Sequence, residues 1–203
     1  MQKSLGRPLL WAACRHHIGE VILTCVWEVL CIEVSKSPDI TLFDRLRTNF
    51  ELLSYSDVTN LNKDLVDNSV ESLDVVRIIN DVLQSKTFAY RGDYIQFLHL
   101  VKVILTGDVT DFALHNIGAV SKARWMAKTI GASDIFLLTP KIKTELPKSA
   151  IATNQQLKQI QRFVKFVALV YCKWWIRCPV SEDAPVNDLD LIEALQKYPD
   201  SHS

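Results

Sequence analysis

A cysteine and two histidines open an apolar segment near the start of the chain, in the stretch Cys14-Arg15-His16-His17. Because Cys14 and His17 are three residues apart, their side chains at a helix start face one point and can supply two ligands to zinc. A closed zinc site needs four ligands, and the remaining candidates by type are His16, Cys172 and Cys178. The alternative is a helix N-terminus with two exposed histidines and no metal.

A second candidate site surrounds Trp125 in the stretch SKARWMAK, where three cations lie close to the indole: Lys122, Arg124 and Lys128. Such cations can hold phosphates while the indole stacks on an unpaired base. This pattern predicts a local nucleic-acid site. The alternative is that Trp125 anchors a helix in the core and the cations form its solvated face.

Two adjacent aromatic residues, Trp174 and Trp175, form a third candidate site within KWWIRC. Neighbouring side chains leave a helix about 100° apart, so both cannot point centrally into one core. We therefore expect an interface at this pair, the alternative being a wide apolar face near the helix end. A cluster of acids follows, and we interpret it as helix caps and solvated surface: Asp183, Asp188, Asp190 and Glu193.

The elements that must position these residues are helices, because apolar residues recur at three- and four-residue steps along most of the chain. In the first helix this pattern predicts a buried stripe of Ile18, Val21, Ile22, Cys25, Val26, Val29 and Leu30. Gly107 is expected to cap a helix C-terminus, and Asn187 to begin the last helix. The expected helices span 15–30, 40–50, 73–83, 92–107, 118–139, 154–178 and 187–195.

The sequence contains no alternating strand series and no glycine-rich phosphate loop. We predict an all-α, irregular multi-helix domain of roughly six to eight helices. Residues 1–203 are interpreted as a single helical domain, with a polar flexible connector near 54–72 and a polar C-terminal tail.

Lysine plus arginine and aspartate plus glutamate number 23 each among the 203 residues, so any contact with nucleic acid must be local. The five cysteines are odd in number and several lie in apolar runs, which favours a reducing compartment. No apolar run reaches the roughly 20 residues that span a bilayer. We therefore expect a nuclear or cytoplasmic protein without a membrane partner.

The Cys14-x-x-His17 pair at the head of an apolar helix, with Arg124-Trp125 far downstream, resembles the hAT-type transposases and their domesticated relatives. In that family a ribonuclease-H-like core carries two aspartates, a Cys-x-x-His helix, a large helical insertion with an Arg-Trp pair, and a last catalytic glutamate. The resemblance implies that His17 lies beside a catalytic centre, that Trp125 stacks on a flipped base and that Arg124 contacts the phosphate.

The sequence departs from this family at several points. No segment before Cys14 supplies the two aspartates, Met126-Ala127 replaces polar residues, and no final glutamate is matched. We expect a fragment or domesticated remnant that has no enzymatic activity in isolation. We also expect no cofactor in this chain. A divalent metal would bind only if another part of a longer chain supplied the missing carboxylates.

Two functions follow from these patterns. The first is a catalytically incomplete, transposase-derived module that binds DNA or a protein partner. The alternative is a helical protein–protein interaction module unrelated to transposons. The expected partner is DNA, another protein or a further copy of the chain. A small zinc enzyme built on Cys14, His16 and His17 ranks third.

Overall fold

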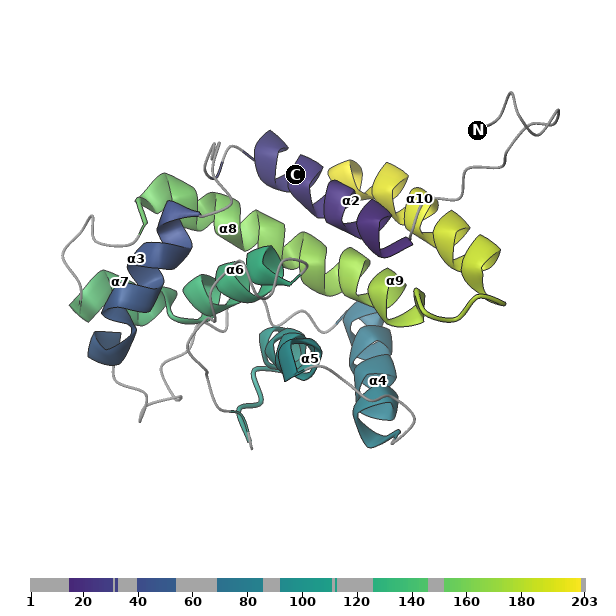
Figure 1. The fold of residues 1–203 in the computed structure, drawn as a ribbon, viewed down its shortest axis with the longest axis horizontal. Helices are drawn as coiled ribbons and strands as arrows, with labels where there is room; N and C mark the ends of the chain where they lie inside the picture. Colours follow the sequence, from purple (N-terminus) through teal and green to yellow (C-terminus); the bar gives the residue numbers. More distant parts are fainter. Residues whose placement is uncertain are drawn as a thin grey trace, which may run out of the picture.

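The structure is a computed structural model, and it describes residues 15–30, 32, 40–53, 69–85, 92–110, 112, 126–145 and 152–201. This part of the chain is helical and contains no strand (Figure 1). The prediction of an all-α, irregular multi-helix fold is confirmed. None of the helices in these ranges is long and apolar enough to cross a membrane.

The helices follow one another along the chain with short helical turns between some of them. In order they are α2 (Arg15–Val29), α3 (Thr41–Asn49), η1 (Phe50–Leu53), α4 (Val70–Gln84), α5 (Gly92–Thr106), α6 (Ala127–Leu137), α7 (Thr139–Glu145), α8 (Asn154–Phe166), η3 (Val167–Tyr171), α9 (Cys172–Arg177) and α10 (Ala184–Ser201). The joining segment η3 is a π-helix, so α8, η3 and α9 form one continuous helix. Counted in this way, the described residues form eight α-helices.

Local sequence signals account for several helix ends. Thr153 and Gln156 form a capping box at the start of α8, in which each backbone N–H donates to the other residue's side chain. Ser69 caps α4 by accepting a hydrogen bond from the backbone of Ser72. Gly107, with a φ of 66°, follows α5 in the left-handed conformation that glycine adopts freely, as the sequence predicted.

The continuous helix α8–η3–α9 crosses the molecule, with α2 and α10 on one side and α4 and α5 on the other in Figure 1. Helix α6 is the most deeply placed, since every one of its residues except Lys128 is buried. Gly131 lets α6 approach α3 closely, because a Cβ at this position would lie 2.6 Å from the ring of Phe43. Fully buried aromatic side chains fill the centre: Phe43, Phe97, Phe136, Phe163, Phe166 and Tyr171.

The predicted buried stripe of α2 is wrong in its angular position. Val21 is 47% exposed and Val29 is 80% exposed, and Ile18 and Cys25 are also exposed. The buried face instead contains Gly19, Leu23 and Trp27, four residues apart. Ile22, Val26 and Leu30 lie at the margin of that face and are partly buried. Because apolar residues surround most of this helix, their spacing does not fix which side is buried, and the contacts of Trp27 with Phe43 and Phe163 decide it.

Candidate functional site

A pocket of about 150 Å³ lies between α4, the η3–α9 segment and α10, and we call it the α4–α10 pocket. It is lined by residues of all these elements: Glu71, Val75, Leu169, Val170, Lys173, Trp174, Asn187, Asp190, Leu191 and Ala194. Its interior is therefore mostly aliphatic with one indole, and its charged groups come from three different helices.

The π-helix η3 forms part of the pocket wall through Leu169 and Val170. The backbone N–H of Cys172 bonds to the carbonyl of Val167, five residues earlier, instead of the usual four. The extra residue rotates the side chains that follow relative to the buried stripe of α8. Trp174 consequently faces Asp188 on α10, and Lys173 reaches Asp74 on α4. Single π-turns in α-helices are frequent at functional sites.

Hydrogen bonds hold the Trp174 side chain in the pocket wall. Its indole Nε1 donates to Oδ1 of Asp188 at 2.8 Å, and the backbone carbonyl of Trp174 accepts a bond of 3.0 Å from Nδ2 of Asn187. The guanidinium of Arg15 lies 5.8 Å from the ring centroid of Trp174 and bonds to the same Asp188 oxygen at 2.6 Å. These bonds connect α2 and α10 to α9 around a single indole.

Two further features fix this arrangement. Desolvation raises the pKa of Asp188, but the hydrogen bonds from Arg15 and Trp174 outweigh it and hold the pKa below its ordinary value. On the other side of the ring, a Cβ at Gly19 would lie 2.7 Å from Cζ3 of Trp174. Only glycine therefore permits this close approach of α2 to α9.

Ion pairs surround the mouth of the pocket. The carboxylate of Asp74 accepts bonds from Arg77 at 2.7 Å and from Lys173 at 2.9 Å, and these two cations lower its pKa to about 2. Arg177 and the lining residue Asp190 are 3.7 Å apart. The Asp74–Lys173 pair ties α4 to α9 beside the pocket.

The two tryptophans predicted to form an interface are both buried in the fold, Trp174 at 3% and Trp175 at 6% exposure. The two rings are buried because they enter different packed regions, and the expected interface at this pair stays a prediction. Trp175 packs edge-on against Tyr94 and Phe97, with centroid distances of 4.9 and 5.3 Å. Trp174 lines the pocket, so it alone of the pair borders a surface that a partner can reach.

The predicted nucleic-acid site falls mostly on Lys122, Arg124 and Trp125, which lie outside the described residues. Its fourth member, Lys128, is half-buried and donates a hydrogen bond of 2.7 Å to Oγ1 of Thr24 on α2. Desolvation lowers the pKa of Lys128. In this position Lys128 ties α6 to α2.

The predicted zinc ligands are not brought together in the described part of the chain. Cys14 and the side chain of His16 lie outside it, and His17 is exposed, with Nδ1 3.7 Å from Oε2 of Glu20. Cys172 and Cys178 are buried, and burial raises the pKa of Cys172, which disfavours the thiolate that a metal binds. In the described ranges no group of three or more histidine, cysteine or acidic residues is placed to hold a metal.

The sequence did not identify the residues of α10 that build the pocket. Helix α10 begins at Ala184, three residues before the predicted Asn187, so Asn187 is an interior residue that is 2% exposed. Pro185 marks the first turn of the helix and was the available signal. The interpretation of most of the acids as caps and solvated surface is wrong for Asp188, which binds Arg15 and Trp174. Asp190 is exposed, as that interpretation expects, and it also lines the pocket.

Comparisons with protein-family models, with curated proteins and with solved structures give no significant match to this chain. The resemblance to hAT-type transposases thus depends on the two short motifs alone, and three of their four residues are outside the described ranges. The geometry of the α4–α10 pocket provides the more direct argument about function.

Proposed function

We propose that the chain is a helical protein-binding module whose α4–α10 pocket receives one apolar side chain of a protein partner. The observation that supports this function is the pocket itself, which combines aliphatic walls with charged groups at its mouth. Binding grooves between helices commonly take the apolar anchor residues of a partner in this way.

The size of the pocket favours a side chain over a cofactor. Sites for cofactors and drug-sized ligands usually measure about 300–1,000 Å³. The α4–α10 pocket measures about 150 Å³, and an apolar cavity of roughly that volume accommodates a group the size of benzene. A leucine or phenylalanine side chain matches this volume.

The expected binding energy favours a polypeptide over a small free molecule. Burying one leucine or phenylalanine side chain contributes about 1.5–3 kcal/mol, whereas even millimolar affinity corresponds to about 4.1 kcal/mol. The remaining energy must come from contacts outside the pocket. Val70 and Val186, next in sequence to the lining residues Glu71 and Asn187, are 80% and 64% exposed and can provide such contacts.

Nuclear magnetic resonance with defined peptides tests this function. The probes are an alanine-based helical peptide of about 15 residues with one central leucine, and the same peptide with alanine in place of the leucine. We expect the leucine peptide to shift the indole Nε1–H signal of Trp174 more than that of Trp175, because only Trp174 lines the pocket. The alanine peptide should shift both signals weakly and equally.

Two variants of α10 complete the test. Ala194→Leu places an aliphatic side chain in the pocket and should abolish the difference between the two peptides. Gln196→Leu adds the same side chain at an exposed position that does not line the pocket and should leave the difference intact. Equal responses to the two peptides in the unmodified protein would exclude the proposed function.

DNA binding by a transposase-derived module stays a prediction from the sequence. Three of its four expected residues lie outside the described ranges, and Lys128 is hydrogen-bonded to Thr24. Of the described residues, those that line the α4–α10 pocket support the protein-binding function.

A further inference from the structure

Three charged residues line the α4–α10 pocket: Glu71, Lys173 and Asp190. Two of them already have partners of opposite charge, since Lys173 is 2.9 Å from Asp74 and Asp190 is 3.7 Å from Arg177. Glu71 is exposed and makes no ion pair with any residue in the described ranges. It is therefore the lining charge that is free to pair with a bound molecule.

The position of Glu71 in the first turn of α4 gives it a possible structural role, because a carboxylate there interacts favourably with the helix dipole. The capping role itself belongs to Ser69, whose hydroxyl accepts from the backbone of Ser72. The carboxylate of Glu71 is thus not needed for the cap, and its charge remains available at the rim of the pocket.

We infer that Glu71 determines the charge specificity of the pocket by pairing with a lysine or arginine of the partner, placed next to the apolar anchor. This inference rests on the proposed function and adds the chemistry of the partner, a basic amphipathic segment. Arg77 does not oppose this pairing strongly, because it is bonded to Asp74 and does not line the pocket. The opposite arrangement, an acidic residue beside the anchor, would bring two carboxylates together.

Binding of three peptides tests the inference. All are alanine-based helices with one leucine, and one helical turn from the leucine they carry lysine, glutamine or glutamate. At low salt we expect the lysine peptide to bind roughly three- to tenfold more tightly than the glutamate peptide, with the glutamine peptide between them. Raising the salt concentration should reduce this ratio, because the rim of the pocket is exposed to solvent.

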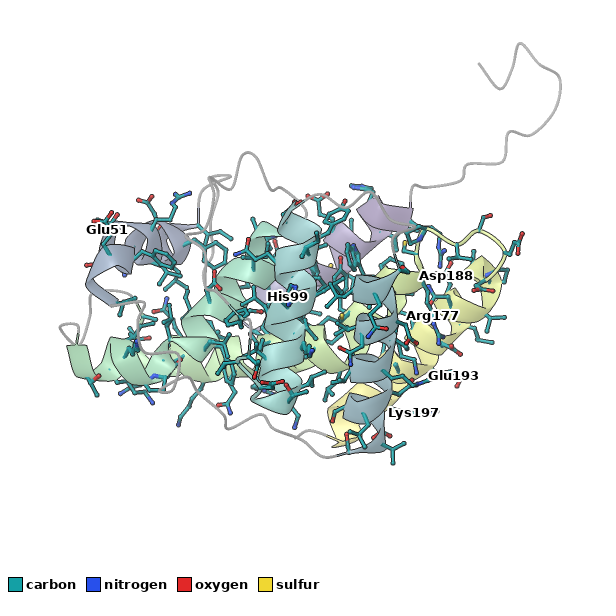
Figure 2. All side chains as sticks on the ribbon, turned by 90° about the horizontal axis from the view of Figure 1, so that it is seen from below. Glu51, His99, Arg177, Asp188, Glu193 and Lys197 are labelled. Carbon is teal, nitrogen blue, oxygen red and sulfur yellow. The ribbon has the colours of Figure 1, made fainter. Side chains whose placement is uncertain are left out.

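Variants of Glu71 assign the effect to this residue. Glu71→Gln should bring the ratio between the lysine and glutamate peptides close to one, and Glu71→Lys should invert it. The control is Glu51→Gln, which removes an exposed carboxylate of η1 at the opposite end of the molecule from Asp188 (Figure 2). This control should retain the ratio of the unmodified protein.

The possible outcomes separate the inference from the function on which it rests. If Glu71→Lys keeps the original preference, or if Glu51→Gln reduces it as strongly as Glu71→Gln, the inference is wrong. If all three leucine peptides bind equally to the unmodified protein but more tightly than a peptide without leucine, the inference again fails and the protein-binding function stands. If no leucine peptide exceeds the peptide without leucine, the proposed function itself is wrong.

Discussion

Trp174 and Trp175 are neighbours in sequence, yet they belong to two regions of the molecule with different chemistry. The indole N–H of Trp174 is hydrogen-bonded to Asp188, and the guanidinium of Arg15 lies over its ring. The indole N–H of Trp175 is buried and has no hydrogen-bond partner in the described part of the chain. Its ring is held by edge-on contacts with Tyr94 and Phe97.

The same difference extends beyond the two indoles. Around the α4–α10 pocket, polar groups from α2, α9 and α10 bond to one another over long sequence separations. Within the packed helices α5, α6 and α8, several buried side-chain polar atoms have no partner in the described ranges: those of Gln96, Ser133, Asp134 and Gln159. Near the pocket only Nε of Arg15 is buried without a partner in these ranges. Directed bonds therefore contribute more to the geometry of the pocket, whereas packing is the main term that stabilises the core against the cost of its unpartnered polar groups.

The largest expected effect comes from removing the indole of Trp175 from the core. Trp175→Ala should lower the free energy of unfolding by about 3–5 kcal/mol, because it deletes a buried ring and its contacts with Tyr94 and Phe97. Urea unfolding followed by circular dichroism measures this change. A loss of less than about 1 kcal/mol would contradict the packing described for this region.

A smaller test compares the two indoles directly. Trp174→Phe and Trp175→Phe remove similar volume, but only the first breaks a hydrogen bond. We expect Trp174→Phe to lower the free energy of unfolding by about 1.5 kcal/mol more than Trp175→Phe does. This value is the low end of the range for hydrogen bonds to charged groups, because the side chain of Asp188 is 46% exposed. Equal costs in urea unfolding would show that the bond between Trp174 and Asp188 contributes nothing measurable.

The sequence predicts the fold because its signals are local. The helices and several of their ends follow from spacing and from nearby capping residues, such as Gly107 after α5. The start of α10 was placed three residues late, since Asn187 is also a good cap by residue type. Errors of this size at helix ends do not change the fold class.

The pocket could not be predicted, because its parts meet only in the folded chain. The sequence selected Trp174 as an unusual residue, but its direction depends on the π-helix before it and on Asp188, 14 residues later. Arg15 bonds to the backbone carbonyl of Cys178, which lies 163 residues later in the sequence. The buried face of α2 depends in the same way on the contacts of Gly19 and Trp27 with distant aromatic rings.

The core also contains an ionisable group, Asp134, which is fully buried and has no hydrogen-bond partner for either carboxylate oxygen in the described ranges. Desolvation raises the pKa of Asp134 well above its ordinary value, so the folded protein holds the proton. An unfolded aspartate releases its proton above a pH of about 4. The stability contributed by this group is therefore fully present below that pH and declines as the pH rises towards the folded pKa.

The substitution Asp134→Asn tests the direction in which stability changes with pH, and its expected effect is the smallest of these tests. Asparagine has a similar size but does not ionise, so the variant should lose the pH dependence that Asp134 causes. From pH 5 to pH 6 the unmodified protein should become less stable relative to the variant by up to about 1.4 kcal/mol, the limit for one proton per pH unit. Urea unfolding of both proteins at each pH measures the difference, in which other titrating groups such as His99 cancel. If the stability difference between the two proteins is the same at pH 5 and pH 6, Asp134 is ionised in the folded protein, and the contrast between a bonded pocket and an unbonded core fails at this residue.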